Sequence, residues 1–280
     1  MRPGPQRGLL ADLPRLLLLG LGAVVVLAPY VWMLADSVKP GSEIFQDSLS
    51  LWPQRFFAME NYSKALSDAP LLRFLLNGTI VCGLILLLQL LFAVPCAYAL
   101  AKLRWRGRET CFALVTAGLL IPAHVPALPL YAVFATTGLL DSYTALVAPF
   151  AISVFGIFMF RQAFRTLPDE LIQAARIDGM GELSIVWRVV LPNAWPTATA
   201  FATFSIVAHW NDLFWPLVVV QSPGMATPAL GVLFFRAEEA GNDVGALMPA
   251  SVIVTAPMAA FFLLAQRRFI QGVATAGLKG

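Results

Sequence analysis

Polar side chains that could contact a solute gather in one apolar stretch of the chain, where Trp210, Asn211 and Asp212 follow His209. An aromatic ring can stack on the apolar face of a sugar, while amide and carboxylate groups can hydrogen-bond its hydroxyls. Asp212 is the one acidic residue in the long apolar stretches, where a charge is costly and usually faces a cavity or a partner. Trp210, Asn211 and Asp212 are therefore candidate solute contacts. Helix capping or bridging of neighbouring helices is the competing interpretation.

Residues for catalysis, nucleotide binding or metal binding do not show the spacings that these chemistries need. None of the four lysines stands in a phosphate-binding G-x-x-x-x-G-K-[ST] loop. The apolar stretches hold no H-E-x-x-H, no pair of aspartates and no serine clearly matched to a histidine. The two histidines and three cysteines lack metal-site spacing, and we interpret the cysteines as small apolar packers: His124, His209, Cys82, Cys96 and Cys111. We expect no cofactor in this chain.

The composition of the whole chain indicates what surrounds these residues. Of its 280 residues, 59% are hydrophobic and 12% are charged, and the mean hydropathy is +0.75. Water-soluble domains have about 45 to 50% apolar and about 25% charged residues. The apolar excess therefore indicates an integral membrane protein. The net charge of +3 is too weak a balance for a nucleic-acid-binding protein, so we expect no nucleic-acid partner.

Six apolar stretches are each long enough for a transmembrane helix, so we predict an all-α membrane protein. The shortest stretch would still reach about 25 Å as a helix. The stretches do not alternate polar and apolar residues, as the strands of a membrane barrel would. The first exceeds the core of a signal peptide and shows no small-residue cleavage site before Lys39, which predicts a retained helix. The predicted spans are residues 16–34, 74–101, 111–134, 144–160, 197–220 and 246–265.

The basic residues orient these spans. With the N-terminus inside, 14 of the 19 lysines and arginines fall in cytoplasmic segments, in agreement with the positive-inside rule. We therefore expect residues 1–15 and the tail 267–280 in the cytoplasm, so that both the N- and C-termini are cytoplasmic. Residues 35–73 then form an extracytoplasmic loop, with Trp32 and Trp52 as interfacial anchors. Residues 161–196 form a long cytoplasmic loop.

The cytoplasmic loop carries the start and stop signals of two short helices. Thr166 to Glu170 supplies a hydroxyl cap, a proline in the first turn and two acids near the positive end of the helix dipole. Asp178 and Gly179 end this helix. A second helix runs from about Gly181 until Pro192 ends it.

The surface of the first helix has two interpretations. Leu171, Ala174, Ala175 and Asp178 share one face at spacings of three and four. Small residues on that face would let another backbone approach closely, which favours a docking surface. Packing against the chain's own transmembrane helices explains the same face equally well.

Three motifs carry a resemblance to a known family. Gln173-Ala174-Ala175, then three residues, Gly179, nine residues and Val189 to Pro192, is similar to the E-A-A, G, I-x-L-P signature of membrane subunits of bacterial ABC importers. The tail from Gly272 to Gly280 resembles the G-[IV]-A-T-T-G-[LI]-K-G end of carbohydrate-importer permeases of the maltose-transporter type. Trp210 to Leu217 is similar to their W-N-[DE]-x-x-W-P-L block. External-loop residues resemble the same relatives: Ser37, Val38, Lys39, Glu43, Glu60, Asn61 and Tyr62.

The resemblance implies a type I ABC importer permease fold, with residues 74–266 as its transmembrane core. In that family the cytoplasmic loop is a coupling helix that sits in a cleft of the ATPase subunit and transmits its closure to the membrane helices. The positions implied in ATPase coupling are Gln173, Ala174, Ala175, Asp178, Gly179, Leu191 and Pro192. Gln173 stands where the family usually has glutamate, so a charge-assisted contact would become a neutral hydrogen bond of about half the strength. The tail, with Thr275, Gly277 and Lys279, would reach between the ATPases.

The resemblance also implies the partners, the solute and the location. We expect two ATPase subunits that hold ATP and Mg, a second homologous permease chain, an extracytoplasmic solute-binding protein and a bacterial plasma (inner) membrane. Such permeases handle di- and oligosaccharides, amino sugars and glycerol-phosphate compounds, so the expected solute is a sugar or sugar-like compound. Transport would proceed by alternating access, with ATP hydrolysed outside this chain.

Two other functions stay open at this point. A secondary carrier should show internal repeats and ion-coupling charges near the bilayer midplane, for which Asp212 alone is thin support. An intramembrane enzyme would need the catalytic sets that the spans lack. For a set of prolines and glutamines, two interpretations stay open, lining a solute pathway or serving helix packing: Pro95, Pro122, Pro126, Pro129, Gln89 and Gln162.

Overall fold

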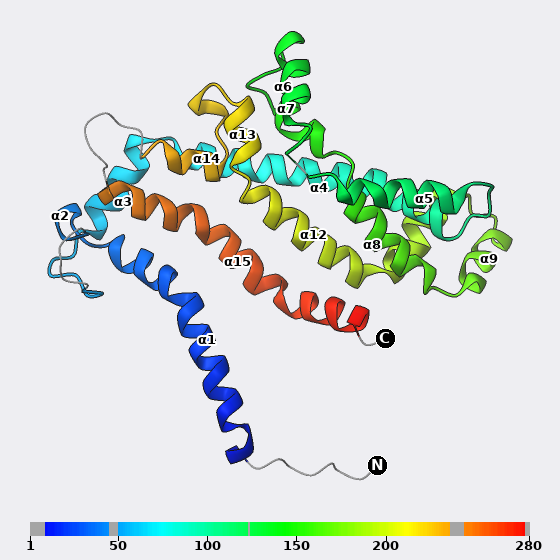
Figure 1. Ribbon diagram of the computed structural model, residues 1–280, viewed down its shortest axis with the longest axis horizontal. Coiled ribbons are helices and arrows are strands. Elements are labelled where there is room, and N and C mark those ends of the chain that lie inside the picture. Colours follow the sequence, from blue (N-terminus) through cyan, green and yellow to red (C-terminus); the bar gives the residue numbers. More distant parts are fainter. Residues whose placement is uncertain (1–8, 45–49, 123, 236–243, 278–280) are drawn as a thin grey trace. The chain divides into compact units, whose positions relative to one another are not determined.

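The computed structural model describes residues 9–44, 50–122, 124–235 and 244–277. Within these ranges the chain is helical and contains no β-strand, as predicted (Figure 1). It divides into two compact units. The first comprises Met1–Ala69 and Phe234–Ile253, and the second comprises Pro70–Leu233 and Val254–Gly280.

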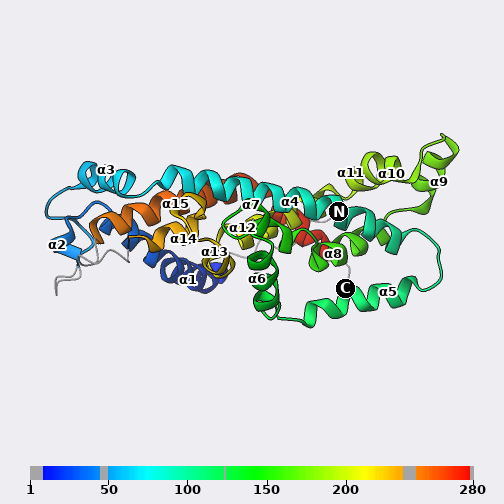
Figure 2. The same ribbon diagram turned by 90° about the horizontal axis from the view of Figure 1, so that it is seen from above.

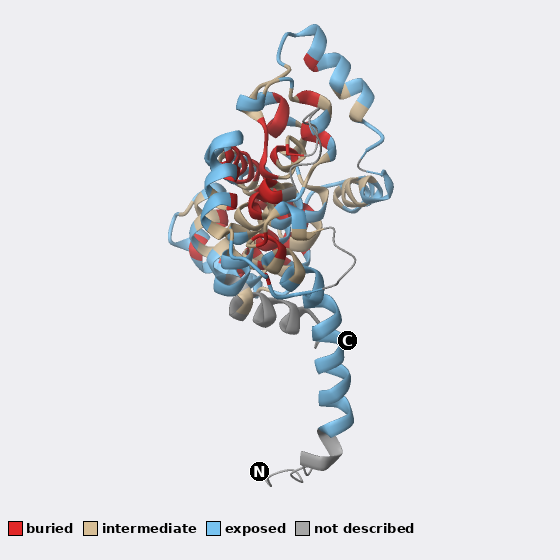
Figure 3. Cartoon of the chain, turned by 90° about the vertical axis from the view of Figure 1, so that its left-hand side faces the viewer, coloured by how far each residue is buried: buried red, intermediate tan, exposed pale blue. Residues whose placement is uncertain are grey.

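The first unit contains a long helix whose residues are exposed from Leu13 to Val31 and become mostly half-buried or buried toward its C-terminal end. Helix α1 (Leu9–Asp36) contains a candidate membrane span, Leu13–Asp36, whose most apolar window has no buried residue. Figure 3 shows the middle of this helix coloured as exposed. Its leucine and valine side chains suit lipid rather than water. Helices α2 (Gly41–Ile44) and α3 (Ala58–Asp68) follow, and α15 (Val244–Gly277) begins in the same unit.

A buried ion pair organises the segment that follows α1. Lys39 Nζ donates to Asp36 Oδ1 at 2.7 Å, and the two side chains are 5% and 6% exposed. Lys39 also donates to the Ser50 carbonyl oxygen. Asn61 on α3 donates to the carbonyl oxygens of Ser37 and Lys39 at 3.1 and 2.7 Å. Because these buried polar groups satisfy one another, they fix α3 against the end of α1.

The second unit is built on α4 (Leu71–Ala101), a helix of 31 residues. It packs against α8 (Val154–Arg165) and α12 (Trp195–Trp210), and Figure 2 shows it extending along the unit. Gly156 on α8 permits this close packing, because a Cβ there would lie 2.8 Å from the Phe201 ring and 3.3 Å from Ala93. The buried cluster between these helices includes Ala93, Val94, Ala97, Tyr98, Phe160, Phe164 and Phe201.

A second apolar cluster surrounds the first half of α4. It joins α4 to α6 (Ala127–Thr136), α7 (Tyr143–Val147) and α13 (Phe214–Val219). Its buried members are Val81, Ile85, Phe134, Ala145, Leu146, Val147, Trp215 and Val219. Helix α14 (Pro228–Leu233), after the short turn η4 (Pro223–Met225), also packs on α4. A Cβ on Gly231 would clash with the Phe74 ring, so this contact requires glycine.

Three predicted spans are confirmed as long apolar helices: Leu13–Asp36, Leu71–Ala101 and Gly245–Leu264. The predicted span 144–160 is a bent pair. Tyr143–Phe150, which comprises α7 and η2 (Ala148–Phe150), meets Val154–Arg165 at 43°. The count of six spans and the cytoplasmic position of both termini stay predictions.

The predicted spans 111–134 and 197–220 are not continuous helices, which corrects the sequence-based prediction. The first is divided into α5 (Arg108–Ala117), η1 (Gly118–Leu120) and α6. Pro122 and Pro126 lie between them, and proline cannot donate the hydrogen bond that would continue a helix. Pro129 sits in the first turn of α6, where no donor is needed. The other span stops at Trp210 and resumes at Phe214, whereas α4 continues through Pro95.

Candidate functional site

Residues 166–193, which belong to the segment predicted to be a cytoplasmic loop, are called the α9 loop. It begins where α8 ends, and Thr166 donates its hydroxyl to the Ala163 carbonyl at 2.8 Å. Helix α9 (Asp169–Ile177) then starts with Pro168 at its N-cap and no side-chain cap. The predicted hydroxyl cap is therefore wrong, because Thr166 caps the end of α8 instead. The predicted acids Asp169 and Glu170 do lie in the first turn of α9.

The stop signal at Asp178 and Gly179 is confirmed in detail. Gly179 has φ +79°, a left-handed conformation that glycine adopts without strain. The Gly179 N–H donates to the Arg176 carbonyl and the Met180 N–H to the Ala175 carbonyl, both at 3.0 Å. These two bonds form a Schellman motif, which satisfies the last carbonyls of the helix. Asp178 and Gly179 are exposed at this corner.

After the corner the chain returns toward α12 through three short segments: α10 (Glu182–Ile185), the π-helix η3 (Val186–Val190) and α11 (Leu191–Asn193). The second helix was predicted to end at Pro192, but Pro192 lies inside α11 and the helical path continues. The Leu191 N–H reaches back five residues to the Val186 carbonyl. A wider turn here is compatible with Pro192, which has no N–H of its own to donate. Leu191 is half-buried and Pro192 is exposed.

The two faces of α9 differ in burial. Ile172 and Ala175 are 4% and 6% exposed and belong to the cluster that contains Tyr98 and Phe160. The outer face of α9 comprises Glu170, Gln173, Ala174 and Ile177, all exposed. The structure therefore separates the two alanines that the sequence placed on one patch: Ala174 faces outward, and Ala175 packs against the chain's own core.

The outer face of α9 continues as exposed apolar surface. Ile177 is 85% exposed, Leu183 on α10 is 67% exposed and Leu171 is 42% exposed. A helix whose inner face is fixed in the core and whose outer face presents apolar side chains is suited to contact another protein.

Polar contacts hold the α9 loop to the last turn of α4. Lys102, the C-cap of α4, donates to the Leu167 carbonyl at 2.6 Å and to the Asp169 carboxylate. Tyr98 donates its hydroxyl to Glu182 Oε2 at 2.6 Å, and Arg176 donates to Glu182 Oε1 at 2.8 Å. The contacts that join α4 to the loop connect residues that are 65 to 84 positions apart in the sequence.

The electrostatics of the α9 loop follow from these pairs. The hydrogen bond from Lys102, and then its charge, lower the pKa of Asp169 below its ordinary value. Arg176 first and Tyr98 second lower the pKa of Glu182, while Glu182 raises the pKa of Arg176. The loop therefore keeps its ion pairs at neutral pH.

Arg161 follows the predicted span 144–160, and the structure gives it a packing role that its basic character alone did not indicate. Its side chain is 2% exposed, donates to the Leu100 carbonyl at 3.1 Å and to Glu109 Oε2 at 2.8 Å, and lies 3.6 Å from the centre of the Phe112 ring. These contacts join α8 to the end of α4 and the start of α5. The hydrogen bond from Arg108 and the charge of Arg161 lower the pKa of Glu109.

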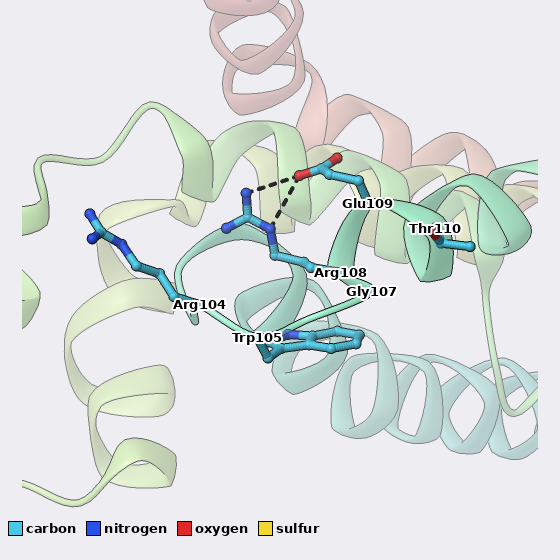
Figure 4. A pocket seen from close by; sticks show the side chains of 6 residues that line it. All are labelled: Arg104, Trp105, Gly107, Arg108, Glu109 and Thr110. Carbon is cyan, nitrogen blue, oxygen red and sulfur yellow. Dashed lines mark hydrogen bonds and ion pairs between the residues drawn. The ribbon is translucent and has the colours of Figure 1, made fainter.

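An open hollow lies beside this junction, in the turn between α4 and α5. Its lining comprises Arg104, Trp105, Gly107, Arg108, Glu109 and Thr110. Figure 4 shows Arg108 turned onto Glu109 and Arg104 directed away from them. Because its central guanidinium is paired with a carboxylate, the hollow is not a strong anion site.

The proposed solute contacts are placed at the break between α12 and α13. Trp210 is buried and its indole N–H donates to the Val254 carbonyl at 3.2 Å. Asn211 is exposed and donates to the Val207 carbonyl at 2.8 Å. Asp212 is half-buried and accepts the Trp215 N–H at 3.3 Å, which is a helix-capping contact. The three residues are close in the chain but perform separate local tasks.

A polar cluster that sequence reasoning left without a role lies inside the second unit. Gln89 on α4 is 5% exposed and donates to the Phe150 carbonyl at 3.0 Å. Ser205 donates to its carbonyl oxygen at 2.6 Å, and His209 Nε2 lies 3.3 Å from its nitrogen. Gln89 is a polar residue in an apolar stretch, but its partners are about 60 to 120 positions away in the sequence, so no local signal indicates them.

The predicted tail contacts are only partly described. Helix α15 ends at Gly277, so Thr275 and Gly277 lie in its last turn. Lys279 lies outside the described residues. In the described part of the chain, no group of three or more His, Cys, Asp or Glu side chains could hold a metal ion.

Comparison with known proteins identifies a consistent set of similarities. The family model of the binding-protein-dependent transport system inner membrane component matches residues 89–275. This range contains Gln89, the whole α9 loop, the Trp210–Asp212 block and most of α15.

Three curated relatives are similar over nearly the whole chain. The arabinooligosaccharides transport system permease protein AraQ of Halalkalibacterium halodurans is 32% identical over 260 residues, which cover 92% of this chain and 93% of the relative. The sn-glycerol-3-phosphate transport system permease protein UgpE of Yersinia pestis is 31% identical over 264 residues, covering 92% and 94%. The diacetylchitobiose uptake system permease protein NgcG of Streptomyces coelicolor is 31% identical over 259 residues, covering 91% and 85%.

A solved structure has the same fold. It is the crystal structure of a bacterial ABC transporter involved in the import of the acidic polysaccharide alginate. One of its chains matches with a TM-score of 0.83 and 22% identity, over 96% of this chain and 100% of that chain.

Proposed function

Since this chain belongs to the family of binding-protein-dependent transport system inner membrane components, as a permease of sugar ABC transporters, we propose that it forms half of an ATP-driven import pathway. A permease subunit is a translocation component and not an enzyme, and its family implies ATPase and solute-binding protein partners. A second homologous permease chain would form the other half of the pathway. Two ATPase subunits would hold ATP and Mg on the cytoplasmic side of a bacterial plasma membrane.

The proposed topology has six spans, a transmembrane core at residues 74–266 and both termini in the cytoplasm. The pairs α5–α6 and α12–α13 would each cross the bilayer as a broken helix. Non-helical backbone at membrane depth is tolerated where it is buried in protein or lines a cavity. The breaks around Pro122 and Asn211 are therefore compatible with a solute pathway between the helices.

The outer face of α9 carries the proposal for ATPase coupling. Its inner face is fixed by Ile172 and Ala175, while Ala174 and Ile177 face outward beside the exposed Gly179 corner. This surface has the shape and apolar character of a short helix that fits a groove in a partner. Gln173 would contribute a neutral hydrogen bond. Leu191 and Pro192 would shape the return to α12, and Asp178 would border the contact.

The solute is proposed to be a sugar or sugar-like compound. The relatives are named for arabinooligosaccharides, sn-glycerol-3-phosphate and diacetylchitobiose, which are all rich in hydrogen-bonding groups. Of the three candidate contacts, Asn211 is the one with an exposed side chain, and it lies at a helix break. Trp210 and Asp212 would shape this break. The tail residues Thr275, Gly277 and Lys279 would approach the ATPases.

Replacing Ile177 with Asp tests the coupling proposal. The charge would be placed on the outer face of α9 without disturbing the buried face. Loss of an interface hot spot costs about 2 kcal/mol, so we expect about 30-fold weaker retention of the ATPases and a matching loss of uptake. Uptake of labelled arabinotriose, sn-glycerol-3-phosphate and diacetylchitobiose is measured in proteoliposomes that contain ATP and the reconstituted complex.

Ile177→Val is the matched control, because it keeps an apolar side chain at the same position and should retain the ATPases. Normal ATPase retention and uptake in Ile177→Asp would reject the outer face of α9 as the coupling surface. Uptake driven by an ion gradient through this chain alone would assign a secondary carrier instead.

A further inference from the structure

Helix α4 carries buried polar side chains at three levels along its length. They are called the outer level at Asn77, the middle level at Gln89 and the inner level at Tyr98. Each contacts a segment far away in the sequence. At about 1.5 Å per residue, Asn77 and Tyr98 are about 30 Å apart along the helix, which is about the thickness of a hydrocarbon core. Helix α4 is unbroken between these two residues. The predicted spans 111–134, 144–160 and 197–220, which lie in the same unit, are bent or interrupted.

The inner level of α4 holds the α9 loop at both ends. Lys102 binds the Leu167 carbonyl and Asp169 where α9 begins. Tyr98, which is 2% exposed, donates to Glu182 just after the Gly179 corner. Arg176 donates to the other carboxylate oxygen of Glu182. Glu182 therefore links the two sides of the Gly179 corner and joins the corner to α4.

The middle level of α4 holds the interior of the helix bundle. Gln89 binds the Phe150 carbonyl, at the bend before α8, and accepts the hydroxyl of Ser205 on α12. It also contacts His209, one residue before the end of α12. A change in the position of Gln89 therefore reaches the bend of one predicted span and the break of another.

The outer level of α4 holds the segment after α13. Asn77 is fully buried and donates to the carbonyl oxygens of Gly224 and Ala226, both at 2.9 Å. Its own carbonyl oxygen accepts the hydroxyl of Tyr143 at 2.7 Å. These contacts fix α7 and the turn at η4 to the same helix.

We propose that α4 transmits the displacement of the α9 loop across the membrane, and that Glu182 is the positioning residue that joins the loop to α4 through Tyr98. This inference rests on the proposed coupling function of the loop. Apolar packing between Ile172, Ala175 and Tyr98 holds the parts together, but hydrophobic attraction is not directional. A hydrogen bond weakens steeply when its distance or angle changes. The bond from Tyr98 to Glu182 therefore fixes the register between the loop and α4.

Tyr98→Phe tests this role because it removes the bonding hydroxyl and keeps the buried ring. The complete complex with its ATPases is used, in a background with the cysteines replaced by alanine. Nitroxide labels at Leu72→Cys, on the exposed outer end of α4, and at Leu128→Cys, on α6, report the distance between these helices. We expect ATP and Mg²⁺ to shift this distance, and Tyr98→Phe to reduce the shift by about half or more while the ATPases stay bound.

Three further variants control the measurement. Glu182→Ala changes an exposed residue and removes the bond from Tyr98 together with the one from Arg176, with little risk to folding, and we expect the same reduced shift. Glu182→Gln keeps an acceptor for Tyr98 and should recover part of the shift. Tyr30→Phe removes an exposed tyrosine hydroxyl from α1 and should leave the shift unchanged.

The outcomes separate this inference from the proposed function. A full shift in both Tyr98→Phe and Glu182→Ala would overturn the role of Glu182, and no shift in the parent complex with bound ATPases would overturn transmission by α4. Loss of the ATPases from Tyr98→Phe would assign the bond to the shape of the loop and also reject transmission. If Ile177→Asp keeps the ATPases and the full shift, the coupling surface itself is wrong, whatever Tyr98→Phe does.

Discussion

The α9 loop and the Trp210–Asp212 block both contain sequence motifs, yet the chain uses their side chains in opposite ways. In the α9 loop, Ala175 is packed inside while Ala174 and Ile177 remain exposed. In the block, the polar groups of Trp210 and Asp212 bond to other parts of the same chain. A surface that the fold does not use is a stronger indication of a partner than a polar group that already has an intramolecular bond.

The largest loss of stability is expected for Trp210→Ala. This substitution tests whether the Trp210–Asp212 block serves the fold, as its internal bonds indicate, or mainly contacts solute. Trp210 is 7% exposed and bonds Val254. Removing a buried tryptophan costs about 3 to 5 kcal/mol. We therefore expect a lower yield of folded protein and earlier thermal unfolding in detergent. Normal stability combined with a raised KM for solute would instead show that Trp210 is primarily a solute contact.

A matched pair of alanine substitutions sharpens the comparison within α9. Ala175→Leu would overfill the core and should cost about 1 to 3 kcal/mol of stability. Ala174→Leu places the same side chain on the outer face, so it should leave the unfolding temperature nearly unchanged and weaken ATPase retention. Unfolding is followed by fluorescence and retention by co-purification. Equal effects of the two substitutions on stability would contradict the opposite burial of the two alanines.

The smallest effect is expected at Asp212. Asp212→Ala removes the acceptor for the Trp215 N–H and should cost about 1 kcal/mol, as for other helix caps. Asp212→Asn keeps an acceptor and should recover most of that loss. The unfolding midpoint separates the two variants. A transport defect of equal size in both, without a change in stability, would mean that the charge of Asp212 serves the solute pathway.

Local sequence signals predicted the features that depend on neighbouring residues. The corner at Gly179 was predictable because a left-handed residue after a helix favours glycine. The long helices α1 and α4 were predictable from continuous apolar stretches. The acids Asp169 and Glu170 correctly marked the start of α9.

Features that depend on distant contacts were not predictable in the same way. The spacing on α9 predicts one patch for Ala174 and Ala175. Neighbouring residues on a helix point about 100° apart, however, and only Ala175 is buried in the core. The bond that Ser205 donates to Gln89 and the bond that Tyr98 donates to Glu182 join residues 116 and 84 positions apart. The division of residues 111–134 by Pro122 and Pro126 was underestimated, because proline in an apolar stretch can either bend a helix or end it.

The exposed apolar side chains of the α9 loop also have a consequence for biogenesis. If the α9 loop lies in the cytoplasm as proposed, a newly inserted subunit exposes the apolar side chains of Ile177 and Leu183 there until a partner covers them. Such surfaces promote aggregation and capture by chaperones and proteases. Synthesis of the subunits in matched amounts would therefore benefit the cell, because chaperones and proteases would recognise an unassembled copy by this exposed apolar surface.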